Sequence, residues 1–209
     1  IWETLLERKD DLPAGVTQAD LIQEGLEWLQ DRQDRDDWNY VWRALLKRKN
    51  HLNPDAQTSL IQEGLNWLQV RQDRNDWAFI WQALLEHPDH LPEGTTQADL
   101  LAEGLAWLQE RQDRDDWTYV WRALLEHPDH LTDGTTQTDL LAEGLEWLQD
   151  RQDRDDWNFI WRALLEHPNH LPEGTTQVDL LAEGLEWLQD RQDRDDWNYI
   201  WRTLLEHPD

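Results

Sequence analysis

Hydrophobic and polar positions along the chain recur with a long, regular period, and each period holds two helical patterns. In one copy, the apolar residues from Leu140 to Leu148 fall within an arc of roughly 160° at about 100° per residue, and acidic side chains fill the other side. This pattern predicts an amphipathic first helix. Thr136 and Asp139 have the spacing of a capping box, so the helix is expected to begin there.

The second pattern in the same copy predicts a helix that is mostly buried. Apolar side chains between Trp157 and Leu165, Phe159 included, cover roughly 240° of this helix. The polar side chains form only a narrow stripe, which consists of Asn158, Arg162 and Glu166.

Polar residues and prolines mark the ends of this second helix. Asp155 or Asp156 is expected to cap its start. Pro168 is expected to end it, since proline disfavours helical geometry in the residue before it and cannot donate a backbone hydrogen bond. Pro172 and Gly174 then turn the chain into the next copy.

The tryptophans show the same repetition. They fall into three series that share this period, and one series includes Trp107, Trp147 and Trp187. One copy holds Trp147, Trp157 and Trp161. No segment alternates apolar and polar residues as a strand does. A period of this length is typical of solenoids, in which each copy buries its apolar face against its neighbours. We therefore predict an all-α fold, an α-solenoid of stacked antiparallel helix hairpins.

The whole chain, residues 1–209, is predicted to form a single repeat array. It starts with a partial copy at 1–16, which contains Trp2 and is predicted to be a second helix. Five full units follow this partial copy, at 17–55, 56–95, 96–135, 136–175 and 176–209.

The origin of the array can also be inferred. Near-identical copies favour recent duplication in a natural protein, with a designed consensus array as the alternative. The lack of polar end caps favours a fragment of a longer array.

The unit resembles the tetratricopeptide-like repeats. Gly144, Trp147 and Pro168 match that family's spacing of a small residue, an aromatic residue and a proline. Ile160 and Ala163 fall on its apolar and small positions in the second helix. The resemblance covers nearly the whole chain, and it implies two antiparallel helices per unit with a binding surface along the first helices.

The unit also departs from that family. Glu143 stands where the family prefers a leucine-type residue and Asp156 where it prefers alanine, and the unit is about six residues longer than the usual 34. Long arrays of near-identical helical repeats are also similar to the sensor or scaffold regions of large bacterial signalling proteins.

Composition narrows the possible partners. The chain has 45 acidic and 19 basic residues, a formal net charge of −26, and no cysteine. Such a charge repels nucleic acid and anionic membranes, and no apolar run approaches the ~20 residues of a membrane span. Disulfides and thiolate metal sites are excluded. No targeting segment is evident, so a cytoplasmic location is expected. The net charge also predicts that added salt raises the melting temperature.

Two motifs suggest metal sites. Histidines three residues apart, as at His127 and His130, could bind a divalent metal, but Pro128 breaks the helical geometry that would bring them together. Capping of the helix end is the alternative that we favour. The acidic stretch 150–156 suggests calcium, yet arginines interrupt the acids and no glycine provides the sharp turn. Ion pairs within the loop explain that composition better, so we predict no metal and no cofactor.

The surface offers the remaining candidate site. Acidic side chains of the first helices would stack from unit to unit into a ribbon that either keeps the array soluble or docks a partner. Trp147, at the edge of the apolar arc, is expected to be partly exposed there, although packing explains the tryptophans better than a stacking platform for sugars or bases. The candidate partner-binding residues are Glu103, Glu143, Glu146, Glu183, Glu186 and Trp147.

Three functional hypotheses follow. The first is a non-enzymatic scaffold that binds a basic protein or peptide, or another copy of itself, and no nucleic acid or membrane. The second is a structural spacer or sensor arm of a larger signalling protein. The third is metal binding through the His-x-x-His loops. Catalysis is not expected, because Ser59 is the only serine, cysteine is absent and the paired carboxylates recur in every unit.

Overall fold

The computed structural model describes residues 16–131, 134–191, 193 and 197–206. Within these residues every regular element is helical. Four short 3-10 helices follow the second helices, at Lys49–His51, Pro88–His90, Pro128–His130 and Pro168–His170. The α-helices form pairs that recur with the period of the sequence. The pairs are α2 (Gln18–Asp31) with α3 (Trp38–Leu46), α4 (Pro54–Val70) with α5 (Trp77–Leu85), α6 (Gln97–Glu110) with α7 (Trp117–Leu125), α8 (Gln137–Asp150) with α9 (Trp157–Glu166), and α10 (Gln177–Asp190) with α11 (Trp197–Glu206).

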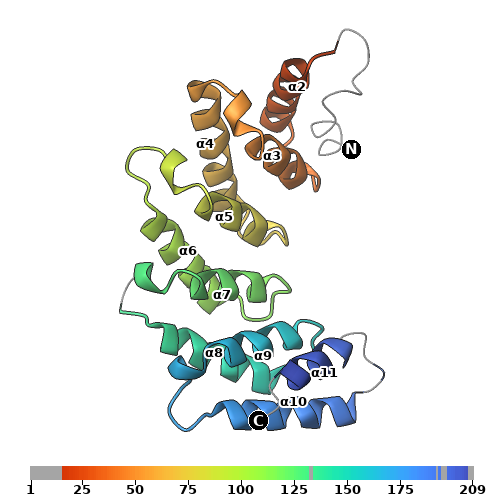
Figure 1. Cartoon of the computed structure of the whole chain (residues 1–209). Coiled ribbons are helices and arrows are strands. Elements are labelled where there is room, and N and C mark those ends of the chain that lie inside the picture. The colour runs from red at the N-terminus through yellow and green to blue at the C-terminus, as the bar shows by residue number, and fades with distance from the viewer. Residues whose placement is uncertain (1–15, 132–133, 192, 194–196, 207–209) are drawn as a thin grey trace. The chain divides into compact units, whose positions relative to one another are not determined.

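The chain divides into two compact units, Ile1–Glu103 and Gly104–Asp209. In the first unit, α2 packs against α3, α3 against α4 and α4 against α5. In the second unit, the helices from α7 to α11 contact their successors in the same way (Figure 1). Second helices of neighbouring pairs also touch, as α7 and α9 do. Each unit is thus a stack of helix hairpins, which confirms the predicted α-solenoid.

The helix bounds refine the predicted organisation. The partial helix at 1–16, with Trp2, lies outside the described residues except for Val16. Helix α4 begins at Pro54, two residues before the predicted start of its unit. Asn53 caps it, because its Oδ1 accepts the Ala56 N–H at 2.8 Å, and proline tolerates the first helical position.

The first helices other than α4 begin with a capping box, as the sequence predicts for α8. The Thr136 hydroxyl accepts the Asp139 N–H at 3.2 Å, and the Asp139 carboxylate accepts the Thr136 N–H at 2.8 Å. Hydrogen bonds from the Thr136 side chain and backbone lower the pKa of Asp139. The same box opens α10 at Thr176 and Asp179.

The second helices end as predicted but begin differently. Helix α9 ends at Glu166, before Pro168, and Gly174 turns the chain at φ 89°. At the other end, Asp156 occupies the cap position without making a side-chain cap bond. Its carboxylate instead accepts from Arg154 Nε at 3.3 Å. Of the two predicted caps, Asp155 or Asp156, the second therefore stands at the cap position but does not cap the helix through its side chain.

Tryptophans form the core of each repeat and connect it to the next. The Trp157 indole N–H donates to the Leu148 carbonyl of the same hairpin at 3.1 Å. The Trp161 indole N–H donates to the Leu180 carbonyl of the next first helix at 2.7 Å. Both rings are fully buried and stack on each other with centroids 5.9 Å apart. The apolar stripes predicted from the sequence are therefore packing surfaces between hairpins.

A glycine in each of three first helices receives the tryptophan of the preceding hairpin. A Cβ atom added at Gly184 would lie 2.3 Å from Cζ2 of Trp161, and one at Gly144 would lie 2.3 Å from Cζ2 of Trp121. Gly64 has the same relation to Trp42. Because the rings are held in the core, only glycine fits these contacts.

The predicted polar stripe of the second helix is partly wrong. Asn158 is buried and Phe159 is 44% exposed, the reverse of the prediction. The Nδ2 of Asn158 donates to the Asp155 carbonyl at 3.4 Å, and the equivalent Asn39, which is also buried, donates to Asp76 of the following loop at 2.8 Å. The aromatic residue beside it then faces outward, as Tyr119 also does.

Candidate partner-binding surface

Three of the five glutamates predicted for partner binding occupy one repeated position of the first helices. Glu103 on α6, Glu143 on α8 and Glu183 on α10 are half-buried rather than exposed. Burial raises the pKa of the Glu103 carboxyl. Burial is also the main cause of the raised pKa values of Glu143 and Glu183, with Glu146 and Glu186 adding to it by charge repulsion.

A fourth residue, Glu63 on α4, belongs to the same set although the sequence analysis did not select it. It is half-buried, and burial raises its pKa, opposed by a hydrogen bond from Gln30. Its Oε2 atom is buried without a hydrogen-bond partner. Its place one full period before Glu103 was the signal that could have found it. We call these residues at one repeat position, Glu63 and Glu103 in the first unit and Glu143 and Glu183 in the second, the carboxylate row.

Part of the carboxylate row borders a groove between first helices. In the first unit, a cavity of about 200 Å³ lies between α4 and α6. Leu65 and Gln69 line it from α4, and Glu103 lines it from α6 together with the capping residue Asp99. A group docked in this groove would therefore meet a carboxylate that has lost part of its hydration.

The other candidate residues differ in their exposure. Glu146 and Glu186 are exposed. Trp147 is only 2% exposed, so the prediction of a partly exposed ring is wrong. Its ring stacks on Trp117 at 5.5 Å, and its indole N–H donates to the Gln112 carbonyl of the preceding loop at 3.3 Å. Trp147 therefore connects repeats and offers no ring face to a partner.

The acidic loops form ion pairs between repeats as well as within them. Arg154 pairs with Asp156 of its own loop at 3.3 Å and with Asp115 of the preceding loop at 2.9 Å. Arg151 likewise reaches Asp113 of the preceding loop at 2.9 Å. The prediction of pairing within the loop was correct but incomplete, because the arginines also neutralise acids of the neighbouring repeat.

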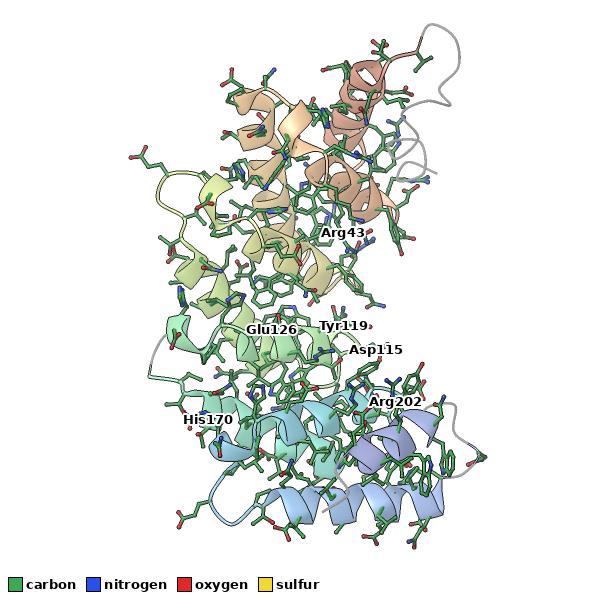
Figure 2. All side chains as sticks on the ribbon, in the orientation of Figure 1. Arg43, Asp115, Tyr119, Glu126, His170 and Arg202 are labelled. Atoms are coloured by element: carbon green, nitrogen blue, oxygen red, sulfur yellow. The ribbon has the colours of Figure 1, made fainter. Side chains whose placement is uncertain are left out.

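None of the described histidines lines the groove beside Glu103. His87 is half-buried beside Lys49, whose Nζ lies 3.0 Å from its Nδ1. Burial, with the Lys49 charge, lowers the pKa of His87. Figure 2 shows His170, which follows α9, on the opposite side of the second unit from Asp115, which precedes α7. Across the described part of the chain, no group of three or more acidic, histidine or cysteine side chains is arranged to hold a metal ion.

In both units the second helices expose aromatic side chains that the sequence analysis assigned to the core. Tyr119 lies close to Asp115 at the start of α7, and Glu126 lies towards its other end (Figure 2). An aromatic residue recurs at the position of Tyr119 in every helix pair. The apolar arc of the second helix had assigned this position to the core. The exposed members are Tyr40, Tyr119, Phe159 and Tyr199.

Comparisons with known proteins give no relative. The chain matches no protein family, no curated protein and no solved structure. None of the helices in the described ranges has the length and apolar character that crossing a bilayer requires. The helical repeat architecture is therefore the firm basis for a functional proposal.

Proposed function

We propose that the chain is a non-enzymatic interaction scaffold whose carboxylate row binds basic groups of a protein partner. The observation that carries this proposal is the repeated half-burial of Glu63, Glu103, Glu143 and Glu183, each with a raised pKa. A carboxylate that has lost part of its hydration is costly to ionise until a cation approaches. A lysine or arginine would compensate this cost.

Charge distribution supports the same proposal. The net charge of −26 would attract a basic partner over a distance. The arginines of the loops are already paired with loop aspartates, so they do not neutralise the acidic side chains of the first helices. The resemblance to tetratricopeptide-like repeats, which bind along their first helices, favours this face. A spacer role in a signalling protein would not require half-buried carboxylates at a fixed position.

The test compares two variants with the same change in net charge. Lysine-rich peptides are first selected for binding to the unmodified chain, and the best is titrated by calorimetry. Glu103→Gln, Glu143→Gln and Glu183→Gln together should weaken binding by about tenfold, the effect of losing one charge-assisted contact. The control replaces exposed Glu93, Glu126 and Glu173 by glutamine and should change affinity by less than about twofold.

Equal weakening in both variants would mean that the peptide responds to net charge alone, and the carboxylate row would then not be the site. Sedimentation of the unmodified chain alone provides the other comparison. If the chain self-associates and the row variant does not, the basic partner is a second copy.

A further inference from the structure

Helix α11 exposes an apolar face that is buried in every other described second helix. Trp201 is 45% exposed and Leu205 is 64% exposed, whereas the equivalent Trp161 and Leu165 of α9 are 0% and 2% exposed. Trp201 and Leu205 lie four residues apart, so they share one side of the helix. We call this side the α11 face. The proposed function uses neither residue.

A first helix covers the equivalent face of α9. The Trp161 indole N–H donates to the Leu180 carbonyl of α10 at 2.7 Å. The Trp161 ring also lies against Gly184, where a Cβ atom would be only 2.3 Å from Cζ2. Trp121 of α7 makes the same two contacts with α8. The complement of such a face is therefore a helix with a leucine and, four residues later, a glycine.

The exposed ring already has the geometry that receives such a helix. Trp201 stacks on Trp197 with ring centroids 5.8 Å apart, and the equivalent pair in α9 stacks at 5.9 Å. The Trp197 indole N–H donates to the Leu188 carbonyl of α10 at 3.1 Å, which fixes the pair to its own hairpin. Helix α11 also packs against both α10 and α9 (Figure 1). Because the ring is held before binding, little side-chain entropy is lost on docking.

We propose that the α11 face binds an amphipathic helix of a partner protein, with a leucine and a glycine four residues apart on its apolar side. The leucine carbonyl accepts the Trp201 N–H, the glycine admits the edge of the ring, and apolar side chains of the partner cover Leu205. Continuity with the interface between α9 and α10 is the reason for this choice of partner. This is recognition of a helix by its apolar side, so it does not depend on the carboxylate row.

The test titrates the isotope-labelled full chain with the peptide acetyl-TQTDLLAEGLEWLQD-amide, which has the sequence of residues 136–150. NMR follows the Trp201 indole N–H signal, which is assigned by its loss in Trp201→Phe. Salt of about 0.5 M shortens the screening length to about 4 Å, so it largely removes the repulsion between the acidic peptide and the acidic chain. We expect a saturable shift of this signal.

A second peptide is the matched control, with alanine at the position of Gly144. Its added Cβ atom meets the Trp201 ring, and alanine also favours the helix, so weaker binding cannot be due to loss of helicity. Calorimetry should give this peptide an affinity at least about tenfold lower.

Two variants of the chain test the face itself. Trp201→Ala should lower the affinity for the first peptide at least about tenfold, because it removes both the ring and the N–H donor. Tyr199→Ala removes another exposed aromatic ring of α11 and should change the affinity by less than about twofold.

Four outcomes would overturn the proposal: no binding of the first peptide, equal binding of the alanine peptide, unchanged affinity in Trp201→Ala, or the same loss in Tyr199→Ala. Sedimentation of the chain alone tests the other occupant. If the chain dimerises and Trp201→Ala abolishes the dimer, a second copy covers the face and the assignment to a partner protein is wrong.

The carboxylate row variant separates this proposal from the proposed function. Normal binding of the first peptide by that variant supports the α11 face, whatever happens to the binding of lysine-rich peptides. Loss of binding in that variant would place the peptide on the carboxylate row, and the α11 face would then not be its site.

Discussion

At the scale of single residues, the three tryptophans of the α8–α9 hairpin donate their indole N–H groups to three different places. Trp157 donates within its own hairpin, Trp161 to the next first helix and Trp147 to the preceding loop. Each ring thus removes apolar area from water and also satisfies a backbone carbonyl. In this hairpin the three tryptophans therefore make three different connections.

Two tryptophans at one repeat position allow the hydrogen bond to be measured apart from the ring. Trp147 donates to Gln112, whereas the buried Nε1 of Trp67 has no partner. Trp147→Phe should therefore lower the free energy of unfolding by about 1 kcal/mol more than Trp67→Phe, since only the first leaves a carbonyl unsatisfied. Urea unfolding of both variants measures the difference. Equal losses would show that this bond adds nothing.

The glycine contacts give a second prediction at this scale. Gly144→Ala forces a Cβ atom against Trp121, so we expect it to destabilise the chain by about 1 to 3 kcal/mol. At Gly25 the nearest atoms belong to the flexible Leu45 side chain at 3.2 Å. Gly25→Ala should therefore be close to neutral, because the helical preference of alanine offsets the contact. Thermal unfolding compares them, and a stable Gly144→Ala variant would contradict the packing described above.

The effect of the carboxylate row on the free energy of unfolding should depend on pH. A carboxyl whose pKa is raised by folding favours its neutral form in the folded state, so these groups destabilise the fold at neutral pH. That cost disappears as the pH falls through the raised pKa. Changing all four glutamates to glutamine should therefore raise the melting temperature at pH 7, with a smaller gain near about pH 4. A gain that does not depend on pH would exclude this cause.

At the scale of elements, the capping boxes should show the opposite pH dependence. Hydrogen bonds with Thr136 lower the pKa of Asp139, so the stabilisation is present at neutral pH and is lost as the pH falls through the lowered value. Asp139→Asn should lower the melting temperature at pH 7, and should lower it less near about pH 3. Circular dichroism melts at both pH values test this. A loss of the same size at both would indicate a purely steric effect.

Helices and their ends were predictable from sequence because they depend on local rules. The apolar arc, the Thr136 capping box and the stop before Pro168 all act within one turn. Exposure at the edge of the arc was not predictable, because it depends on the neighbouring repeat. Asn39 is buried by a bond to Asp76 in the next loop, 37 residues away. The pairing of Arg154 with Asp115 likewise follows from stacking rather than from local spacing.

At the scale of the whole molecule, net charge and local pairing compete. The chain carries −26 charges, while arginines such as Arg154 already bind acids of two loops. Repulsion among the remaining acids is screened beyond about 8 Å at 0.15 M salt. We therefore expect the melting temperature to rise by a few degrees as salt is raised to that concentration. A flat response would mean that the ion pairs between loops compensate for the excess charge.

The nearly constant interval between each tryptophan and its glycine bears on how such a chain can change in length. Trp121 precedes Gly144 by the same interval as Trp161 precedes Gly184. Recombination between two copies that removes or adds one whole period leaves a tryptophan and a glycine correctly spaced at the junction. The point of crossover within the period does not matter. Unequal exchange between copies would therefore yield longer or shorter proteins that still fold.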